Sequence, residues 1–502
     1  MSEATGLSQV RASFRAALAQ IEAYPVELDW RPAFMTPVNA LPRTQRWPLR
    51  DRATPRPPVQ PFAGQPLTIA GALRGLADGS LTAVALMEQT MAAIAARQAE
   101  LNAFVYVAPA DQLLAAAQAV DDARRRGAPG GLLAGIPISV KDLLEVAGMP
   151  NTASSPVLEG VISTRDAGSI RLLKEAGAII VGKTQTHEFA LGVTTPQSRN
   201  PWDATRDPGG SSGGSAIAVA TGMSLGSMAT DTRASVRVPA ALCGVVGYKP
   251  TFGSVPGDGV TMLSWSLDHI AHMAGTVEDA ALLLNVLQPH RHADYTTVLN
   301  KDVRGLRIVV PAATLEDAEP GVAAAFQRAV QALKQTGAEV VTTDTPSAAD
   351  FDLAVLMGLV VSRCEAAAYH TAFGERRSLY GTTAVAEQLD EASQVSAVAY
   401  LQAQRAREDL RARTLATMAG FDAFLMPTTR VAAPKSSEVD NYFLVLSQNC
   451  ILWSFIGFPV VSVPCGWTAD HLPVGAQLVA GPFEDDRLLA VAAALEAALA
   501  AG

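Results

Sequence analysis

Two serine-containing stretches of the sequence have the residue types needed for nucleophilic chemistry. Both "GGSSG" (209–213) and "GMSLG" (222–226) match GxSxG, the strand-to-helix turn that exposes a nucleophilic serine in the α/β-hydrolase fold. A serine hydroxyl is a weak nucleophile until a base accepts its proton, and in that fold the base is a histidine late in the chain. The late histidines are His269, His272, His290, His292, His370 and His471. None has a distinctive sequence setting, and we expect most of them to be surface or loop residues, which disfavours a Ser-His-Asp site.

A third motif, "GAIIVGKT" (177–184), matches the phosphate-binding pattern GxxxxGK[ST]. That pattern requires a flexible glycine-rich loop whose backbone amides surround the phosphates. Here the middle residues are Ala-Ile-Ile-Val, which favour a buried strand, and Gly177 is typical of a helix end. We therefore do not expect nucleotide binding at this motif.

Three separated features form a better chemical set. Lys141 follows an apolar, strand-like run in "GIPISVKDLLEV". The run "PGGSSGGSA" (208–216) leads directly into an apolar helix, which a flexible linker would not do. Ser235 lies in a turn of small residues in "ATDTRASVRVPAALCGVVGYKPT", between Asp231 and Arg237. We expect that pair to fix the turn through charged hydrogen bonds.

The elements around these features alternate between helix and strand. From Leu67 onward, "NAFVYV" favours a strand, "RDAGSIRLLKEAG" a helix and "AIIVG" a buried strand, and the segment 301–350 repeats the alternation. This pattern predicts an α/β fold with a central mixed sheet flanked by helices. Residues 1–66 contain a helix predicted at 8–22 and nine prolines between positions 32 and 66. We interpret 1–66 as an N-terminal extension and 67–502 as one large domain.

Composition limits the remaining possibilities. The chain has 502 residues, of which 49% are hydrophobic, and a formal net charge of −9, so its charge gives no reason to expect a nucleic acid partner. Four cysteines have no CxxC spacing, so we expect neither a zinc site nor a disulfide framework, and we expect Cys243 to be a buried core thiol. We read no signal peptide and no apolar stretch long enough to span a bilayer, and we expect a cytoplasmic protein.

Six ordered segments resemble the amidase signature family over residues 67–502. They are "GIPISVKD", "AGAIIVGKTQTHEFALG", "RNPWDATRDPGGSSGGSA", "SVRVPAALCGVVGYKPTFG", "FDAFLMPTT" and "GFPVVSVPCG…LPVGAQLVAGPFEDD". The resemblance implies a Ser-cisSer-Lys triad, with Lys141 as the base, Ser211 as the bridging serine and Ser235 as the nucleophile. It also implies a cis peptide bond between Gly210 and Ser211.

The implied chemistry needs these residue types. A lysine acts as a base near pH 7 only when burial lowers its pKa, and Ser211 would relay the proton from Ser235 to Lys141. Attack by Ser235 on an amide carbonyl would give an acyl-enzyme, which water then hydrolyses. The resemblance places the oxyanion hole at the backbone N–H groups of the turn at Thr232, Arg233, Ala234 and Ser235. No metal and no cofactor enters this scheme.

One departure from the family pattern lies beside the nucleophile. Family members usually carry small residues, commonly Gly-Gly or Ala-Gly, where this chain has Arg233 and Ala234. A non-glycine residue at 233 would be strained if the turn required a positive φ there. We weigh two places for the side chain: it turns away and pairs with a nearby carboxylate, or it borders the acyl pocket and meets an acceptor group of the substrate.

We therefore expect an amidohydrolase that cleaves a C–N bond of a small amide, with aryl amides, carbamates and urea derivatives as candidate substrates. The alternatives are the glutamine-hydrolysing component of a tRNA-dependent amidotransferase, a serine esterase of α/β-hydrolase type, and a non-catalytic binding relative. The expected partner is the small-molecule amide itself, without nucleic acid or membrane. A homodimer contact is one role that we consider for the N-terminal extension.

Overall fold

The computed structural model describes residues 49–64, 67–128, 130–288 and 294–501, together with helical residues 12, 15, 16, 18, 19 and 21. The side chains of residues 440 and 441 are not part of this description. Most of the helix predicted at 8–22, and the histidines at 290 and 292, therefore lie outside the described residues.

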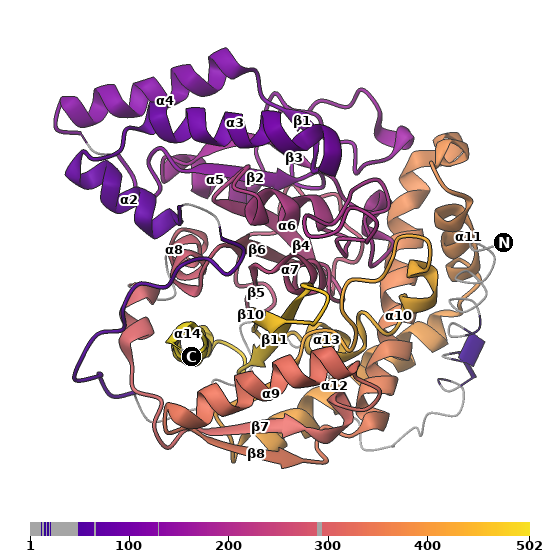
Figure 1. Cartoon of the computed structure of the whole chain (residues 1–502). Coiled ribbons are helices and arrows are strands. Elements are labelled where there is room, and N and C mark those ends of the chain that lie inside the picture. Colours follow the sequence, from indigo (N-terminus) through magenta and orange to yellow (C-terminus); the bar gives the residue numbers. More distant parts are fainter. Residues whose placement is uncertain are drawn as a thin grey trace.

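One mixed sheet runs through the molecule (Figure 1). Its strands are β1 (Phe104–Val107), β2 (Pro137–Lys141), β3 (Ile179–Thr184), β4 (Gly226–Asp231), β5 (Val246–Lys249), β6 (His269–Ala274), β7 (Arg307–Pro311), β8 (Glu339–Thr343), β9 (Ala423–Pro427), β10 (Val460–Trp467) and β11 (Pro473–Val479). The order across the sheet is β1-β3-β2-β4-β6-β5-β10-β11-β9-β7-β8. Strands β3, β2 and β4 are mutually parallel neighbours, as are β8, β7 and β9, whereas the strands between the two groups pair antiparallel. This arrangement confirms the predicted α/β fold with a central mixed sheet.

Helices cover both faces of the sheet (Figure 1). The α-helices are α2 (Ile69–Asp78), α3 (Ala83–Leu101), α4 (Ala110–Arg125), α5 (Gly168–Glu175), α6 (Gly213–Ala220), α7 (Arg237–Cys243), α8 (Val277–Leu287), α9 (Pro320–Gln335), α10 (Ala348–His370), α11 (Thr383–Ala392), α12 (Ala397–Met418), α13 (Gln448–Phe455) and α14 (Asp485–Ala501). Short 3₁₀ segments are η3 (Pro156–Leu158), η4 (Glu188–Ala190), η5 (Tyr295–Asn300), η6 (Ala312–Thr314), η7 (Thr371–Leu379) and η8 (Val439–Tyr442).

Alternation along the strands divides the core into two layers. On β7, Ile308 and Val310 belong to the cluster packed by α8, α9 and α14, whereas Val309 belongs to the cluster packed by α10, α12 and α13. On β9, Leu425 and Phe424 divide in the same way. Because successive side chains of a strand point to opposite faces, one apolar strand supplies both cores.

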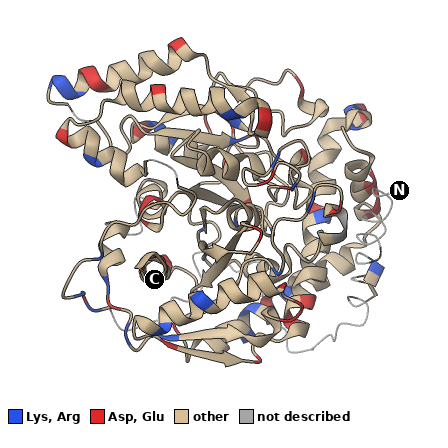
Figure 2. Cartoon of the chain, in the orientation of Figure 1, with Lys and Arg blue, Asp and Glu red and all other residues tan. Residues whose placement is uncertain are grey.

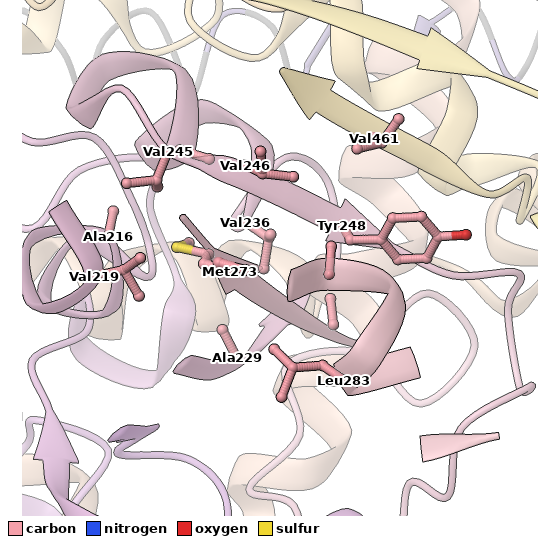
Figure 3. Close-up of a cluster of buried hydrophobic side chains, with 14 of the residues drawn as sticks. Ala216, Val219, Ala229, Val236, Val245, Val246, Tyr248, Met273, Leu283 and Val461 are labelled. Atoms are coloured by element: carbon pink, nitrogen blue, oxygen red, sulfur yellow. The ribbon is translucent and has the colours of Figure 1, made fainter. Parts of the chain in front are cut away.

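A dense apolar cluster supports the central strands (Figure 3). Ala216 and Val219 of α6 pack with Ala229 of β4 and Met273 of β6 in this cluster, and all four are buried. The cluster fixes α6 and β4; the glycine-serine run leads into α6, and the turn with Ser235 follows β4.

Residues 49–64 lie against the body of the molecule. The Phe62 ring stacks on Trp467 at a centroid distance of 4.6 Å, and the Lys301 ammonium contacts Asp51 at 2.6 Å. The Arg56 guanidinium donates to the carbonyl of Lys301 at 2.9 Å. The described end of the predicted extension therefore packs on the domain that follows it.

Acidic and basic residues are interspersed along the outer helices (Figure 2). Helix α4, for example, has Asp111 in its first turn and Arg124 and Arg125 in its last, which complements the helix dipole. Among the helices of the described ranges, none combines the length and the apolar character that crossing a membrane requires.

Candidate active site

The two strands that carry the predicted site end at the same edge of the sheet. Strand β2 ends with Lys141, and its parallel neighbour β4 ends with Asp231. The turn that contains Ser235 follows β4 and leads into α7. The carboxyl ends of parallel strands are the usual place for a ligand site in open α/β sheets, because side chains from adjacent connections meet there.

The glycine-serine run forms the tight loop before α6. Gly209 has φ +80°, in the left-handed region that glycine favours. A Cβ on Gly210 would lie 2.0 Å from the carbonyl oxygen of Thr194, so a side chain has no room there. Ser211 is completely buried in this loop. The peptide bond between Gly210 and Ser211 is cis, as the resemblance predicts.

Lys141 is buried without a carboxylate in contact among the described residues. Its Nζ donates to Ser211 Oγ at 2.8 Å and to Thr230 Oγ1 at 3.0 Å. Burial lowers the pKa of Lys141 to about 7, against the more distant charges of Asp268 and Asp231, which act to raise it. The amine is therefore poised to exchange a proton at neutral pH, and both of its hydrogen-bond partners are hydroxyl groups.

Ser235 lies next to Ser211 but is not joined to it through the side chains. The backbone N–H of Ser212 donates to the carbonyl of Ser235 at 3.2 Å, which holds the loop and the turn together. In the part of the chain that the structure describes, no hydrogen bond connects the hydroxyl of Ser235 with that of Ser211. The structure thus brings Lys141 and Ser211 into contact and places Ser235 beside them.

The turn before α7 leaves several backbone donors free. Within the described ranges, no group accepts a hydrogen bond from the backbone N–H of Thr232, Arg233, Ala234 or Ser235. The next amide, that of Val236, donates to Asp231 Oδ2 at 3.2 Å. Arg233 also has a negative φ, so the strain considered for a non-glycine residue at this position is absent.

Asp231 and Arg237 fix the turn, as predicted from the sequence. The guanidinium contacts the carboxylate through Nε at 3.0 Å and Nη2 at 3.1 Å, and both side chains are fully buried. Arg237 Nη2 also donates to the carbonyl of Arg233 at 2.8 Å. Burial acts to raise the pKa of Asp231, but the charge and hydrogen bonds of Arg237, together with the charges of Lys249 and His269, outweigh it and hold this pKa well below its usual range.

Of the two environments considered for the Arg233 side chain, the one paired with a carboxylate is not found, because the described residues give it no ion pair. The side chain is only 4% exposed, and its Nε and Nη2 have no hydrogen-bond partner. Its aromatic contact is Phe443, whose ring centroid lies 5.8 Å from Cζ. Burial and the neighbouring Arg363 lower the pKa of Arg233 to about 9, so the guanidinium is still charged at neutral pH. A local sequence pattern could not reveal this, because the surroundings of Arg233 come from distant segments.

The stretch that resembles a phosphate-binding loop is strand β3. Its Lys183 is buried, forms an ion pair with Asp142 at 3.0 Å and donates to the carbonyl of Pro150 at 2.8 Å. Gly177 has φ +87° and follows the end of α5. The interpretation of "GAIIVGKT" as a helix end followed by a buried strand is confirmed.

The expectation that most late histidines lie in loops or at the surface is wrong for three of them. His269 and His272 lie on β6, which is covered on both faces, and His370 ends α10; all three are buried. Their ring nitrogens are bonded to the carbonyls of Leu267 and Ala280 and to the hydroxyl of Tyr380, respectively. None of these three rings contacts a serine of the candidate site, so the described late histidines give the Ser-His-Asp interpretation no geometric support.

A pocket of about 800 Å³ adjoins the site. Its lining includes Gln185, His187, Thr194, Gln388 and Phe443. The backbone N–H of His187 donates to the carbonyl of Ser211 at 3.0 Å, which brings this wall to the buried serine loop. Burial lowers the pKa of the His187 ring to about 4, and the charges of Arg363 and Lys141 act in the same direction.

Sequence reasoning missed three contributors to this region. Thr230, a partner of Lys141, has a recognisable signal, since it lies near the end of the strand that precedes the nucleophile turn. His187 and Arg363 have none, because His187 immediately precedes η4 and Arg363 lies on α10, far apart in the sequence. The described residues contain no cluster of three or more His, Cys, Asp or Glu side chains arranged to hold a metal ion. All four cysteines are free, and Cys243 is buried as expected.

Comparisons with known proteins agree with this geometry. A family model described as Amidase matches residues 85–489, a range that includes Lys141, Ser211 and Ser235. The chain is 38% identical over 473 residues to a glutamyl-tRNA(Gln) amidotransferase subunit of Chloroflexus aurantiacus, covering 85% of this chain and 95% of that protein. It is 37% identical over 454 residues to an amidase of Pseudomonas putida, covering 86% and 96%. A crystal structure of an amidase superposes with a TM-score of 0.78 at 32% identity, covering 86% of this chain and 99% of that one.

Proposed function

Because the chain belongs to the amidase signature family, whose members are amidohydrolases acting on C–N bonds, we propose that it hydrolyses a small amide with Ser235 as nucleophile, Ser211 as relay and Lys141 as base. The observation that carries the proposal is the 2.8 Å contact between Lys141 Nζ and Ser211 Oγ, made by a fully buried lysine whose pKa is lowered to about 7. A neutral amine in contact with a serine hydroxyl is the arrangement that serine activation needs.

Each proposed step moves a proton between named groups. Ser235 Oγ attacks the carbonyl carbon while its proton passes to Ser211, and the proton of Ser211 passes to Lys141 Nζ. The tetrahedral oxyanion accepts hydrogen bonds from the free amides of the 232–235 turn. Lys141 returns the proton through Ser211 to the nitrogen of the departing amine as the C–N bond breaks. Water then attacks the acyl-enzyme by the same route and releases the acid and Ser235.

Reorganisation of one contact is part of this proposal. The hydroxyl of Ser235 must come within hydrogen-bond distance of Ser211 Oγ when substrate binds. Catalytic hydrogen bonds are often loose before substrate binds and tighten in the complex.

The test combines a substitution with covalent labelling. We expect Ser235→Ala to fold normally and to lose roughly 10⁴- to 10⁶-fold in kcat on simple amides, since nucleophile removal in other serine hydrolases has effects of this order. A fluorophosphonate probe should label Ser235 in the native chain, as identified by peptide mass spectrometry. Ser212→Ala is the matched control, because this neighbouring hydroxyl donates to the carbonyl of Thr230, at 3.4 Å, rather than to the proposed triad. Labelling of Ser211 instead, or normal turnover by Ser235→Ala, would refute the assignment.

A second candidate function has one observation in its favour. The similarity to the amidotransferase protein of Chloroflexus aurantiacus extends over 95% of that protein. If this chain supplies ammonia in such an assembly, it should hydrolyse L-glutamine in preference to other amides and should gain activity from partner proteins. Assays of ammonia release by the purified chain alone, with L-glutamine and with simple aliphatic and aryl amides, separate the two functions. A chain that hydrolyses none of these amides and takes no label would instead be a non-catalytic relative.

The domain limits, a homodimer contact and a cytoplasmic location remain predictions. Deletion of residues 1–48, followed by measurement of mass in solution, tests whether the extension contributes to an oligomer. The packing of Phe62 on Trp467 is the reason to retain residues 49–64 in that variant.

A further inference from the structure

Arg233 has a charge that its surroundings do not neutralise. Its guanidinium is almost completely buried, yet Nε and Nη2 have no acceptor and the described residues provide no carboxylate within ion-pair distance. A buried charge without a partner is strongly destabilising, and proteins normally pair it or bond it to carbonyl groups. The contact with Phe443 offsets only part of this cost. Arg237, four residues later in the chain, differs from Arg233 because each of its three guanidinium nitrogens donates to an acceptor.

A second buried arginine also has a guanidinium nitrogen that no described residue satisfies. Arg363 on α10 is 3% exposed and donates through Nε to Gln388 Oε1 at 2.9 Å, but its Nη1 has no partner. Burial lowers the pKa of Arg363 to about 10. Its charge also acts on Arg233, lowering the pKa of that side chain. The two positively charged guanidinium groups therefore repel each other in a buried region. An anion bound between them would relieve this repulsion.

A contact partner of each arginine lines the pocket beside the serine loop. Phe443, which contacts Arg233, and Gln388, which accepts from Arg363, line the same pocket of about 800 Å³. His187 also lines this pocket, and the positive charges of Arg363 and Lys141 both act to lower the pKa of its ring.

Glu188 of η4 also lines this pocket, and its carboxylate already has hydrogen-bond partners just before α11. The Glu188 carboxylate accepts from Ser155 Oγ at 2.5 Å and from the backbone N–H groups of Gly381 at 2.9 Å and Thr382 at 3.2 Å. It forms no ion pair with either arginine among the described residues. The free guanidinium donors are thus available to a ligand rather than to Glu188.

We propose that Arg233 and Arg363 bind a carboxylate on the acyl part of the substrate, so that the preferred substrates are monoamides of dicarboxylic acids. The inference rests on the proposed amidase function and names its substrate class. The acyl side follows from position: Arg233 is two residues from Ser235, and its own backbone amide belongs to the proposed oxyanion hole beside the scissile carbonyl. A planar carboxylate can accept from the two guanidinium groups at once.

Matched substrates test the charge directly. The panel pairs malonamate with propanamide, succinamate with butanamide, and glutaramate with pentanamide, so that each pair differs by a carboxylate in place of a methyl group. We expect the native chain to prefer the anionic member of at least one pair by roughly 10- to 100-fold in kcat/KM, the range of a charged hydrogen bond. L-Glutamine is glutaramate with an added ammonium group, which the two cations should disfavour. N-Acetylglycine carries its carboxylate on the amine part and should not share the preference.

Substitutions then assign the effect to the two arginines. Arg233→Met and Arg363→Met should each reduce the anionic-to-neutral ratio of kcat/KM by roughly 10-fold or more. Arg165→Met is the control, because this exposed arginine pairs with Glu145 away from the pocket, and its ratio should not change. An equal loss on anionic and neutral amides in Arg233→Met would overturn the proposal, as would a native preference for N-acetylglycine, for L-glutamine or for the neutral amides.

A binding experiment separates this inference from the catalytic one. Titration calorimetry of Ser235→Ala with succinate and with butyrate needs no turnover, and succinate should bind at least roughly 10-fold more tightly. Loss of that difference in the Ser235→Ala/Arg233→Met double variant supports the subsite whether or not the triad assignment is correct. Equal binding of succinate and butyrate, together with normal hydrolysis of neutral amides by the native chain, would overturn the subsite and leave the proposed function standing.

Discussion

Lys141 and Lys183 are both fully buried on adjacent parallel strands, but their ammonium groups have different partners. Lys183 contacts the carboxylate of Asp142 and donates to two further oxygens, those of Pro150 and Asn151. Lys141 contacts two hydroxyl groups and, among the described residues, no carboxylate. Burial lowers the pKa of both lysines, but only Lys183 has the compensation of an ion pair.

The two arginines of the nucleophile turn differ in the same way. Arg237 is paired with Asp231 and bonded to groups from α13 and β11. Arg233 has donors that no described residue satisfies, and it contacts Phe443, which lines the pocket. In both comparisons the paired cation holds the backbone in place, and the unpaired cation is next to a serine. All four residues are buried cations, and the sequence alone does not separate them. Their partners do: Lys183 and Arg237 stabilise the backbone, whereas Lys141 and Arg233 are available for chemistry or binding.

The largest effect that we expect for these cations is the loss of kcat when Lys141 is replaced. We expect Lys141→Met to lose roughly 10²- to 10⁴-fold in kcat, the usual contribution of a general base. Its free energy of unfolding should not fall, because methionine fills the same space without the cost of a buried amine. Turnover assays and urea denaturation of the same preparation check both statements. A Lys141→Met variant with near-native kcat would show that this lysine is not the base.

Removing a paired cation should instead reduce stability. Lys183→Met and Arg237→Met each leave a buried carboxylate without its partner, and we expect each to lose about 3–5 kcal/mol of unfolding free energy. Arg233→Met, four residues before Arg237, should lose none. Urea unfolding curves of the three variants provide the comparison. If Arg233→Met were as destabilising as Arg237→Met, the distinction between scaffold and free cations would be wrong.

The smallest predicted effect is the pH dependence of the native chain. Since Lys141 acts as a base only when neutral, kcat/KM should rise about tenfold per pH unit below about pH 7 and level off above it. The stability should also rise with pH above 7, because the unfolded lysine, with a pKa of 10.5, keeps its proton while the folded lysine has lost it. Rate profiles and unfolding curves between about pH 5 and about pH 10 measure both.

Asp268 is the control for that profile. Burial raises the pKa of Asp268 to about 6. This value is close enough to the pKa of Lys141 that ionisation of Asp268 could itself produce the rising limb of the pH–rate profile. Its charge also acts to raise the pKa of Lys141, so Asp268→Asn should move the limb to lower pH without removing it. Disappearance of the limb in Asp268→Asn would assign it to the carboxyl group.

The sequence allowed the fold class and the neighbourhood of Lys141, Ser211 and Ser235 to be predicted, because each lies in a contiguous segment with a local pattern. The paired role of Asp231 and Arg237 was predictable for the same reason. Arg363 was not, since α10 reaches the pocket only through tertiary packing. His269 and His272 were misjudged because the burial of β6 on both faces depends on strands and helices that its own sequence does not specify. For Arg233, the sequence left two environments open, and only the packing around it distinguishes them.

The hydrogen bonds of Arg237 have a consequence for the order in which the site can mature on the ribosome. Its guanidinium donates to Cys450, Ser454 and Gln477, and the carboxylate of Asp231 also accepts from Ser454. A nascent chain that has emerged only to about residue 440 therefore contains every residue of the proposed triad but lacks the anchors of the nucleophile turn. Strand β5 would at that stage also lack its neighbour β10. The turn can be completed only after the last strands of the sheet have been synthesised, which ties the onset of reactivity to the C-terminal part of the polypeptide.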